Sequence, residues 1–200
     1  MAVEKRILTD AMQTFRIEAE SLAETAKVLD AEAFGRAVEV LSKAPRIAPA
    51  GCGHTGIACR HFAHLMCCIE RPPRFLSPAE AVHGGMGFLQ PGDVMLLAWR
   101  GGKTDELMPI ADICRKKGVT VIAVTENLSS PLAEKADIVL AMKVTRECDP
   151  YNCQGTTSFA VTCAIFDALQ VAVLEHTGFR NEEFAVIHPH GAVGKRLNQK

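Results

Sequence analysis

The sequence predicts an α/β fold in which a parallel β-sheet is covered by helices on both faces. Short continuous apolar runs alternate with helical patterns along most of the chain, and buried parallel strands typically read as such runs. Two glycine-rich turns each follow an apolar run and lead into a helix. With 48% hydrophobic and 22% charged residues in 200, the chain is expected to form one domain over residues 1–200.

The N-terminal part, residues 1–43, is expected to be helical and to precede the α/β core over residues 44–200. Apolar residues recur at helical spacing in "FRIEAESLAETAKVL" and "AFGRAVEVL". Asp30 lies between these two patterns and is a candidate N-cap. We therefore expect two helices before the first strand.

The core is expected to contain five strands separated by helices and loops. The sequence after the first strand predicts a helix over about 55–69, a long loop over 77–93, a helix ending at Lys117 and a short helix near Pro131. The stretch 156–178 is apolar enough to suggest a membrane span, but polar residues such as Asp167 interrupt it and favour a core helix. The expected strands are residues 46–50, 72–76, 94–99, 119–124 and 136–142.

Composition argues against several classes of partner. A formal net charge of -1 and a pI near 6.6 give no drive toward nucleic acid or an anionic membrane surface. The start "MAVEKRILTD" has no apolar signal segment, so a cytoplasmic location is expected. The eight cysteines include no C-x-x-C pair, and we expect reduced, mostly buried thiols and no metal site. A metal site assembled from His61, His64, His188 and His190 is the less favoured alternative.

The stretch "GCGHTG", residues 51–56, matches the G-x-G-x-x-G pattern of dinucleotide-binding turns. A dinucleotide fold also needs an acidic residue at the end of its second strand, where this chain has Leu76, Ser77 and Pro78. The later "GGKT" resembles a phosphate-binding loop, but Leu97 stands where that motif requires glycine. We therefore expect no cofactor.

Two glycine turns at the carboxyl ends of neighbouring parallel strands can instead hold one small anion. Backbone amides and hydroxyls would bind a phosphate, and cationic side chains would add charge-assisted hydrogen bonds. The alternative is that the glycines only permit tight turns. The predicted phosphate-binding residues are Gly53, His54, Thr55, Arg100, Gly101, Gly102, Lys103 and Thr104.

The order of five segments resembles the SIS (sugar isomerase) domain family, and specifically its arabinose 5-phosphate isomerase branch. These segments are "GCGHTG", "SPAEAVHGGMG", "RGGKTDEL", "VTRECDP" and "IHPHGAVGKRL". The resemblance implies a single SIS domain with a five-stranded sheet in flavodoxin-like order and a phosphorylated sugar as ligand. It also implies a homodimer or homotetramer whose subunits share active sites. The regulatory CBS domains of many relatives are expected to be absent.

The resemblance also implies the chemistry. Aldose to ketose isomerisation moves a proton between adjacent carbons through an enediol, and it needs a base and an acid but no redox cofactor. Glu147 matches the family's acid and is the predicted proton-shuttling base. His188 and His83 match family histidines and are predicted to act in ring opening and proton relay. The alternatives are that Glu147 is a solvated loop carboxylate and His83 a turn residue.

The chain departs from the family pattern at two charged positions. His54 stands where the isomerases carry lysine, and Lys103 stands where their second loop carries glutamate. Exchanging an acid for a base strengthens anion binding but changes the groups available for proton transfer. A non-catalytic sugar-phosphate binding or sensing module is therefore the second hypothesis, although no DNA-binding segment is evident in the first 35 residues.

Overall fold

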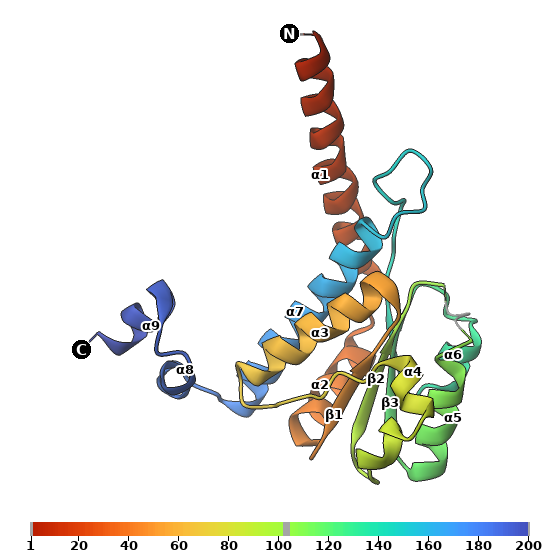
Figure 1. Ribbon diagram of the computed structural model, residues 1–200, viewed down its shortest axis with the longest axis vertical. Helices are drawn as coiled ribbons and strands as arrows, with labels where there is room; N and C mark the ends of the chain where they lie inside the picture. The colour runs from red at the N-terminus through yellow and green to blue at the C-terminus, as the bar shows by residue number, and fades with distance from the viewer. Residues whose placement is uncertain (1, 102–104, 200) are drawn as a thin grey trace.

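The computed structural model describes residues 2–101 and 105–199. Helices and strands alternate from β1 to β4 (Figure 1), and this confirms the predicted α/β class. The elements in chain order are α1 (Ala2–Val28), α2 (Ala31–Lys43), β1 (Ile47–Ala50), α3 (Gly53–Cys67), α4 (Pro78–Val82), the 3₁₀ helix η1 (Gly85–Phe88), β2 (Val94–Ala98), α5 (Met108–Lys117), β3 (Thr120–Thr125), α6 (Pro131–Lys135), β4 (Ile138–Ala141), α7 (Thr157–Thr177), α8 (Asn181–Ile187) and α9 (Gly191–Asn198).

The described residues form a parallel sheet of four strands in the order β1-β2-β3-β4, so the prediction of five strands is wrong. The expected strand that is missing is residues 72–76. This segment still runs beside β1, because Arg74 N donates to Ile47 O at 2.9 Å and Leu76 N donates to Pro49 O at 3.0 Å. Pro49 has no N–H, so β1 cannot donate a bond back at that position. The segment therefore occupies the edge position without forming a full ladder.

Two hydrophobic clusters cover the two faces of the sheet. Helices α2, α3 and α7 pack on one face, and α4, α5 and α6 lie on the other (Figure 1). Phe62 of α3 and Phe166 of α7 are fully buried, with ring centroids 4.8 Å apart. Among the described residues α7 is the helix long and apolar enough to cross a membrane, yet its buried residues pack in this core, against α1, α2 and α3.

The N-terminal boundary prediction is confirmed at Asp30. Its Oδ1 atom accepts a hydrogen bond from Ala33 N at 2.8 Å and caps α2. Two predictions differ from the structure. The expected loop 77–93 contains α4 and η1, and only two of the eight cysteines, Cys59 and Cys114, are buried.

The two ends of the chain extend away from the sheet (Figure 1). The first half of α1 is exposed, including the large apolar side chains of Val3, Ile7, Leu8, Met12 and Phe15. Helix α8 has no buried residue, and α9 buries only Gly194. Neither helix is among those expected from the sequence.

Candidate functional site

The first glycine loop, residues 51–56, joins β1 to α3 at the carboxyl edge of the sheet. A Cβ atom on Gly56 would lie 2.6 Å from Gly51 O, and Gly53 has a φ angle of +54°. Both positions therefore favour glycine. The Cys52 side chain makes no capping hydrogen bond, so the first amides of α3 are suited to an anion.

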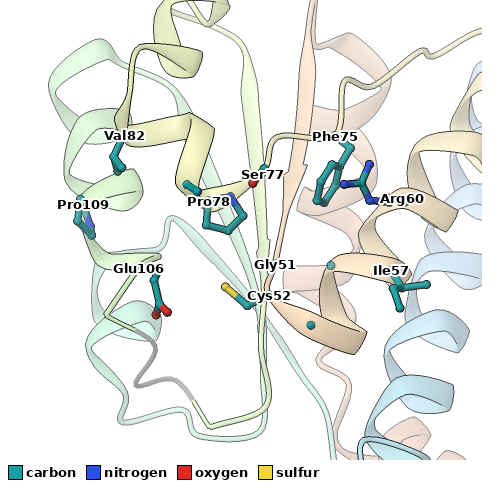
Figure 2. Close-up of a pocket in the computed structure, with 13 residues that line it drawn as sticks. Gly51, Cys52, Ile57, Arg60, Phe75, Ser77, Pro78, Val82, Glu106 and Pro109 are labelled. Atoms are coloured by element: carbon teal, nitrogen blue, oxygen red, sulfur yellow. The ribbon is translucent and has the colours of Figure 1, made fainter.

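A cavity of about 470 Å³ lies beside this loop (Figure 2). Its wall includes the guanidinium of Arg60, whose Cζ lies 3.9 Å from the centroid of the Phe75 ring. Cys52 and Glu106 reach toward the same space from the loops after β1 and β2 (Figure 2). Burial, and to a lesser degree the Glu106 charge, raises the pKa of the Cys52 thiol. The cavity thus combines an apolar wall with one cation and one carboxylate from the described residues.

Glu147 lies in the loop between β4 and α7 and is only 3% exposed. Its Oε2 atom accepts hydrogen bonds from Thr156 N at 3.0 Å, Thr156 Oγ1 at 3.3 Å and Ser158 N at 3.1 Å. Its Oε1 atom accepts one from Arg100 Nη1 at 2.9 Å. Glu147 therefore caps the N-terminus of α7 through one oxygen and pairs with Arg100 through the other.

The surroundings of Glu147 keep it ionised. Burial alone would raise the pKa of this carboxyl, but hydrogen bonds from Ser158 and Thr156 and the charge of Arg100 outweigh it, and the pKa lies below its ordinary value. The loop is held as well, because Glu147 N donates to Asn152 Oδ1 at 2.7 Å. The alternative of a solvated loop carboxylate is therefore wrong for Glu147.

The structure places the other predicted residues of the two loops in different surroundings. Gly53 lines the cavity. The His54 ring instead packs beside Phe159 of α7, and a Cβ atom on Gly155 would lie 2.9 Å from His54 Nδ1. Thr55 is half-buried, with its Cγ2 close to Gly51.

On the second loop, Arg100 lies between two carboxylates, those of Glu147 and Glu126. Gly101 is exposed, and its carbonyl accepts from Asn127 Nδ2 at 3.4 Å. The remaining predicted residues, Gly102, Lys103 and Thr104, lie outside the described residues.

Among the described residues, neither of the two predicted histidines makes a hydrogen bond or an ion pair with Glu147. His83 is exposed at the end of α4. His188 follows α8 and lines a separate cavity of about 530 Å³ with His64 and Cys68, at the far end of α3 from the glycine loop. A helix of 15 residues spans roughly 20 Å. One subunit alone therefore does not assemble the predicted set.

Several residues that define this site were not among the site residues predicted from the sequence. Arg60 and Glu106 are the charged side chains among those lining the cavity, and Thr156 and Ser158 hold Glu147. The cluster Thr156, Thr157 and Ser158 before a long apolar helix is a recognisable helix start that could have indicated a capping partner. Within residues 2–101 and 105–199, no three His, Cys, Asp or Glu side chains gather as a metal site would require.

The sequence of the chain matches a known protein family. The family model described as SIS domain matches residues 40–172. The chain belongs to the SIS domain family. The arabinose 5-phosphate isomerase KpsF of Escherichia coli is 32% identical over 196 residues, which is 98% of this chain and 62% of KpsF. The chain therefore spans about three fifths of the length of that relative.

Solved structures of similar proteins show the same fold. A proposed sugar-phosphate isomerase from Listeria monocytogenes superposes with a TM-score of 0.89 at 39% identity, covering 93% of this chain and 98% of the other. An Escherichia coli CFT073 protein in complex with arabinose 5-phosphate superposes with a TM-score of 0.86 at 25% identity, covering 92% and 98%. The parallel sheet and its covering helices are thus those of sugar isomerase structures.

Proposed function

We propose that this SIS-domain protein is a sugar-phosphate isomerase of the arabinose 5-phosphate and ribulose 5-phosphate type, which interconverts an aldose and a ketose without a cofactor. Its relatives at 32% and 38% identity are arabinose 5-phosphate isomerases. The reaction needs a base that takes a proton from one carbon and returns it to the next, and an acid near the two oxygens. This proposal includes action in the cytoplasm.

The observation that carries the proposal is the fixed, ionised carboxylate of Glu147 at the carboxyl edge of the sheet. Three of its four hydrogen bonds end on Oε2, so this oxygen anchors the side chain. Oε1 accepts only from Arg100 among the described residues and keeps acceptor capacity, since a carboxylate oxygen has about two lone-pair sites. In our proposal Oε1 takes the substrate proton.

The phosphate is proposed to bind near the start of α3. The first-turn amides, which the Cys52 side chain does not cap, and the predicted loop residues Gly53, His54 and Thr55 lie there, and Arg60 brings a cation to the adjoining cavity. A phosphate at a helix N-terminus gains from both the unpaired N–H groups and the helix dipole. Positioning of this kind can supply much of the rate enhancement.

We further propose that the active protein is a homodimer or homotetramer in which His188 and His83 reach sites shared between subunits. His188 lies at the opposite end of α3 from the glycine loop of its own chain, and the exposed apolar residues Val3, Ile7 and Phe15 lie on the N-terminal half of α1. A second copy covering that half would remove this surface from water. Light scattering that finds a monomer at micromolar concentration contradicts this part.

A non-catalytic sugar-phosphate binding module is the second candidate. It is favoured by the hydrogen bonds that already occupy Glu147 and by the histidine at position 54. A turnover screen with five- and six-carbon sugar phosphates separates the two candidates. Conversion of at least one of them is expected, whereas saturable binding without conversion of any would favour the binding module.

A further inference from the structure

Arg100 follows β2 and its backbone is fixed by the neighbouring strand. The Arg100 carbonyl accepts hydrogen bonds from Glu126 N and from Thr125 Oγ1, both at 3.1 Å. Its side chain reaches two carboxylates: Nε donates to Glu126 Oε2 at 2.9 Å and Nη1 donates to Glu147 Oε1 at 2.9 Å. The guanidinium is therefore held at one end while its other end meets Glu147.

The contact on Glu147 falls on the oxygen with spare acceptor capacity. Oε2 is occupied by the N-terminus of α7, through Thr156 and Ser158. Oε1 faces Arg100. Among the described residues, Arg100 is the one cation in direct contact with this carboxylate. It contacts Oε1, which is the atom that accepts the substrate proton in our proposed function.

We propose that Arg100 is a positioning residue that keeps Glu147 ionised and its Oε1 atom in one orientation, while Glu126 holds Arg100 in place. The inference rests on the proposed function, because it assigns Arg100 to the base. It differs from the sequence prediction that Arg100 binds phosphate. The two roles have different kinetic signatures.

Other charged groups near Glu147 are already engaged elsewhere. Lys143, after β4, pairs with Glu126 Oε1 at 3.5 Å. Arg146 donates to the backbone carbonyls of Glu147 and Asp149, both at 3.0 Å. From the helices, Glu18 of α1 contacts Cys148 Sγ at 3.8 Å, and His54 of α3 packs beside Gly155. Among the residues that the structure describes, Arg100 therefore remains as the cation in direct contact with Oε1.

The proton transfer balances without any further reactant. The C–H bond next to the carbonyl breaks, its proton forms an O–H bond on Oε1, and the electron pair moves into the enediolate. The proton of the neighbouring hydroxyl group passes to the former carbonyl oxygen, and Oε1 returns its proton to the adjacent carbon, where the electron pair of the enediolate forms the new C–H bond. Arg100 favours the ionised carboxylate before the first transfer and after the second, and its fixed position limits the directions in which Oε1 can point.

The kinetic test compares Arg100→Gln and Arg100→Lys with Glu126→Gln. Arg100→Gln is expected to lower kcat by about ten- to a hundredfold, the size typical of a lost hydrogen bond to a charged group. KM for the sugar phosphate should change only a few-fold, and the acidic limb of the kcat profile should move to higher pH. Arg100→Lys should restore part of both effects, because it keeps the charge but loses the fork geometry.

Glu126→Gln is the matched comparison, because it removes a charge of opposite sign next to the same guanidinium but keeps a side-chain oxygen that can accept from Arg100 Nε. Its acidic limb should stay in place or move to lower pH, since a negative charge near Glu147 is lost. A large rise in KM for Arg100→Gln, with kcat and its acidic limb unchanged, would overturn the proposal and assign Arg100 to the phosphate.

A second readout does not depend on turnover. NMR titration of the Glu147 side-chain carboxyl in ¹³C-labelled protein should give a higher pKa in Arg100→Gln than in the wild type. Equal pKa values in the two proteins would overturn the proposal even in an active enzyme. A higher Glu147 pKa in Arg100→Gln, together with no conversion of any sugar phosphate by the wild type, would instead uphold the role of Arg100 and defeat the proposed isomerase function.

Discussion

Glu147 and Glu106 lie on neighbouring loops at the carboxyl edge of the same sheet but have opposite surroundings. Glu147 is buried, caps α7 and pairs with Arg100. Glu106 is exposed and lines the cavity beside the glycine loop. The buried carboxylate has a fixed position and a lowered pKa, whereas the exposed one is free to follow a ligand. We take a fixed position to indicate the proton-transferring base and an open one to indicate a group that contacts the substrate.

Exchanging each carboxylate for its amide gives the largest expected effect and tests this difference directly. Glu147→Gln should lower turnover by about a hundred- to ten-thousand-fold while sugar-phosphate binding remains, because an amide cannot accept the proton. Glu106→Gln should change KM more than kcat. Steady-state kinetics on both variants measures this. The assignment is reversed if Glu106→Gln abolishes turnover and Glu147→Gln leaves it intact.

The cavity beside the glycine loop should bind a sugar mainly through the phosphate group of the sugar. A phosphorylated sugar at about a hundred times its Kd should stabilise the protein by about 2.7 kcal/mol and raise Tm by several degrees. The same sugar without phosphate should have no comparable effect, and Arg60→Ala should reduce the shift because it removes the cation next to Phe75. Thermal melts measure all three. Equal shifts with and without phosphate would contradict the phosphate site.

The glycine loop beside the cavity can be tested by adding one methyl group. Gly56→Ala should destabilise the protein by about 1–3 kcal/mol, because its Cβ would lie 2.6 Å from the Gly51 carbonyl oxygen. Gly35→Ala in α2 is the matched control, because no atom lies within 4 Å of the added methyl group. That change should stabilise by about 0.5–1 kcal/mol. Urea unfolding of the pair checks this, and equal effects would refute the close approach.

The ion pairs of Glu147 and Glu126 with Arg100 should also make the stability of the protein depend on pH. The folded-state pKa values of Glu147 and Glu126 lie below their ordinary value of 4.5. Their contribution to stability is therefore fully present above about pH 4.5 and is lost as pH falls through the lowered folded values. Glu147→Gln should cost about 1–3 kcal/mol at pH 7, and this difference from the wild type should shrink below pH 4.5. A constant difference down to pH 3 would argue against an ionised, paired Glu147.

Local patterns predicted most of the fold. Asp30, the apolar runs of β1 to β4 and the glycine turn after β1 are each determined by neighbours a few residues away, and all were found where the sequence placed them. Whether residues 72–76 form the fifth strand depends instead on how they pair with β1. Pro49 has no N–H to donate to the segment beside it, and the sequence of that segment alone does not reveal this.

The site was harder to predict because its contacts join distant positions. Glu147 was found through the family resemblance, but its partners Arg100 and Ser158 lie 47 and 11 residues away. Periodicity carries no information on such pairs. The roles of Arg100 in phosphate binding and of His188 and His83 in proton relay stay predictions. In the structure Arg100 pairs with two carboxylates, and His188 lines a different cavity from the one beside the glycine loop.

The central claim, that Glu147 shuttles a proton through an enediol, is tested most directly by exchange of solvent deuterium into the carbon next to the substrate carbonyl. The measurement follows proton transfer even when net conversion is slow, and mass spectrometry or NMR of the sugar phosphate detects it. The wild-type protein should incorporate deuterium from heavy water into at least one five- or six-carbon sugar phosphate, and Glu147→Gln should not. Saturable binding of these sugar phosphates by the wild type with no incorporation into any of them would contradict the claim and leave a binding module.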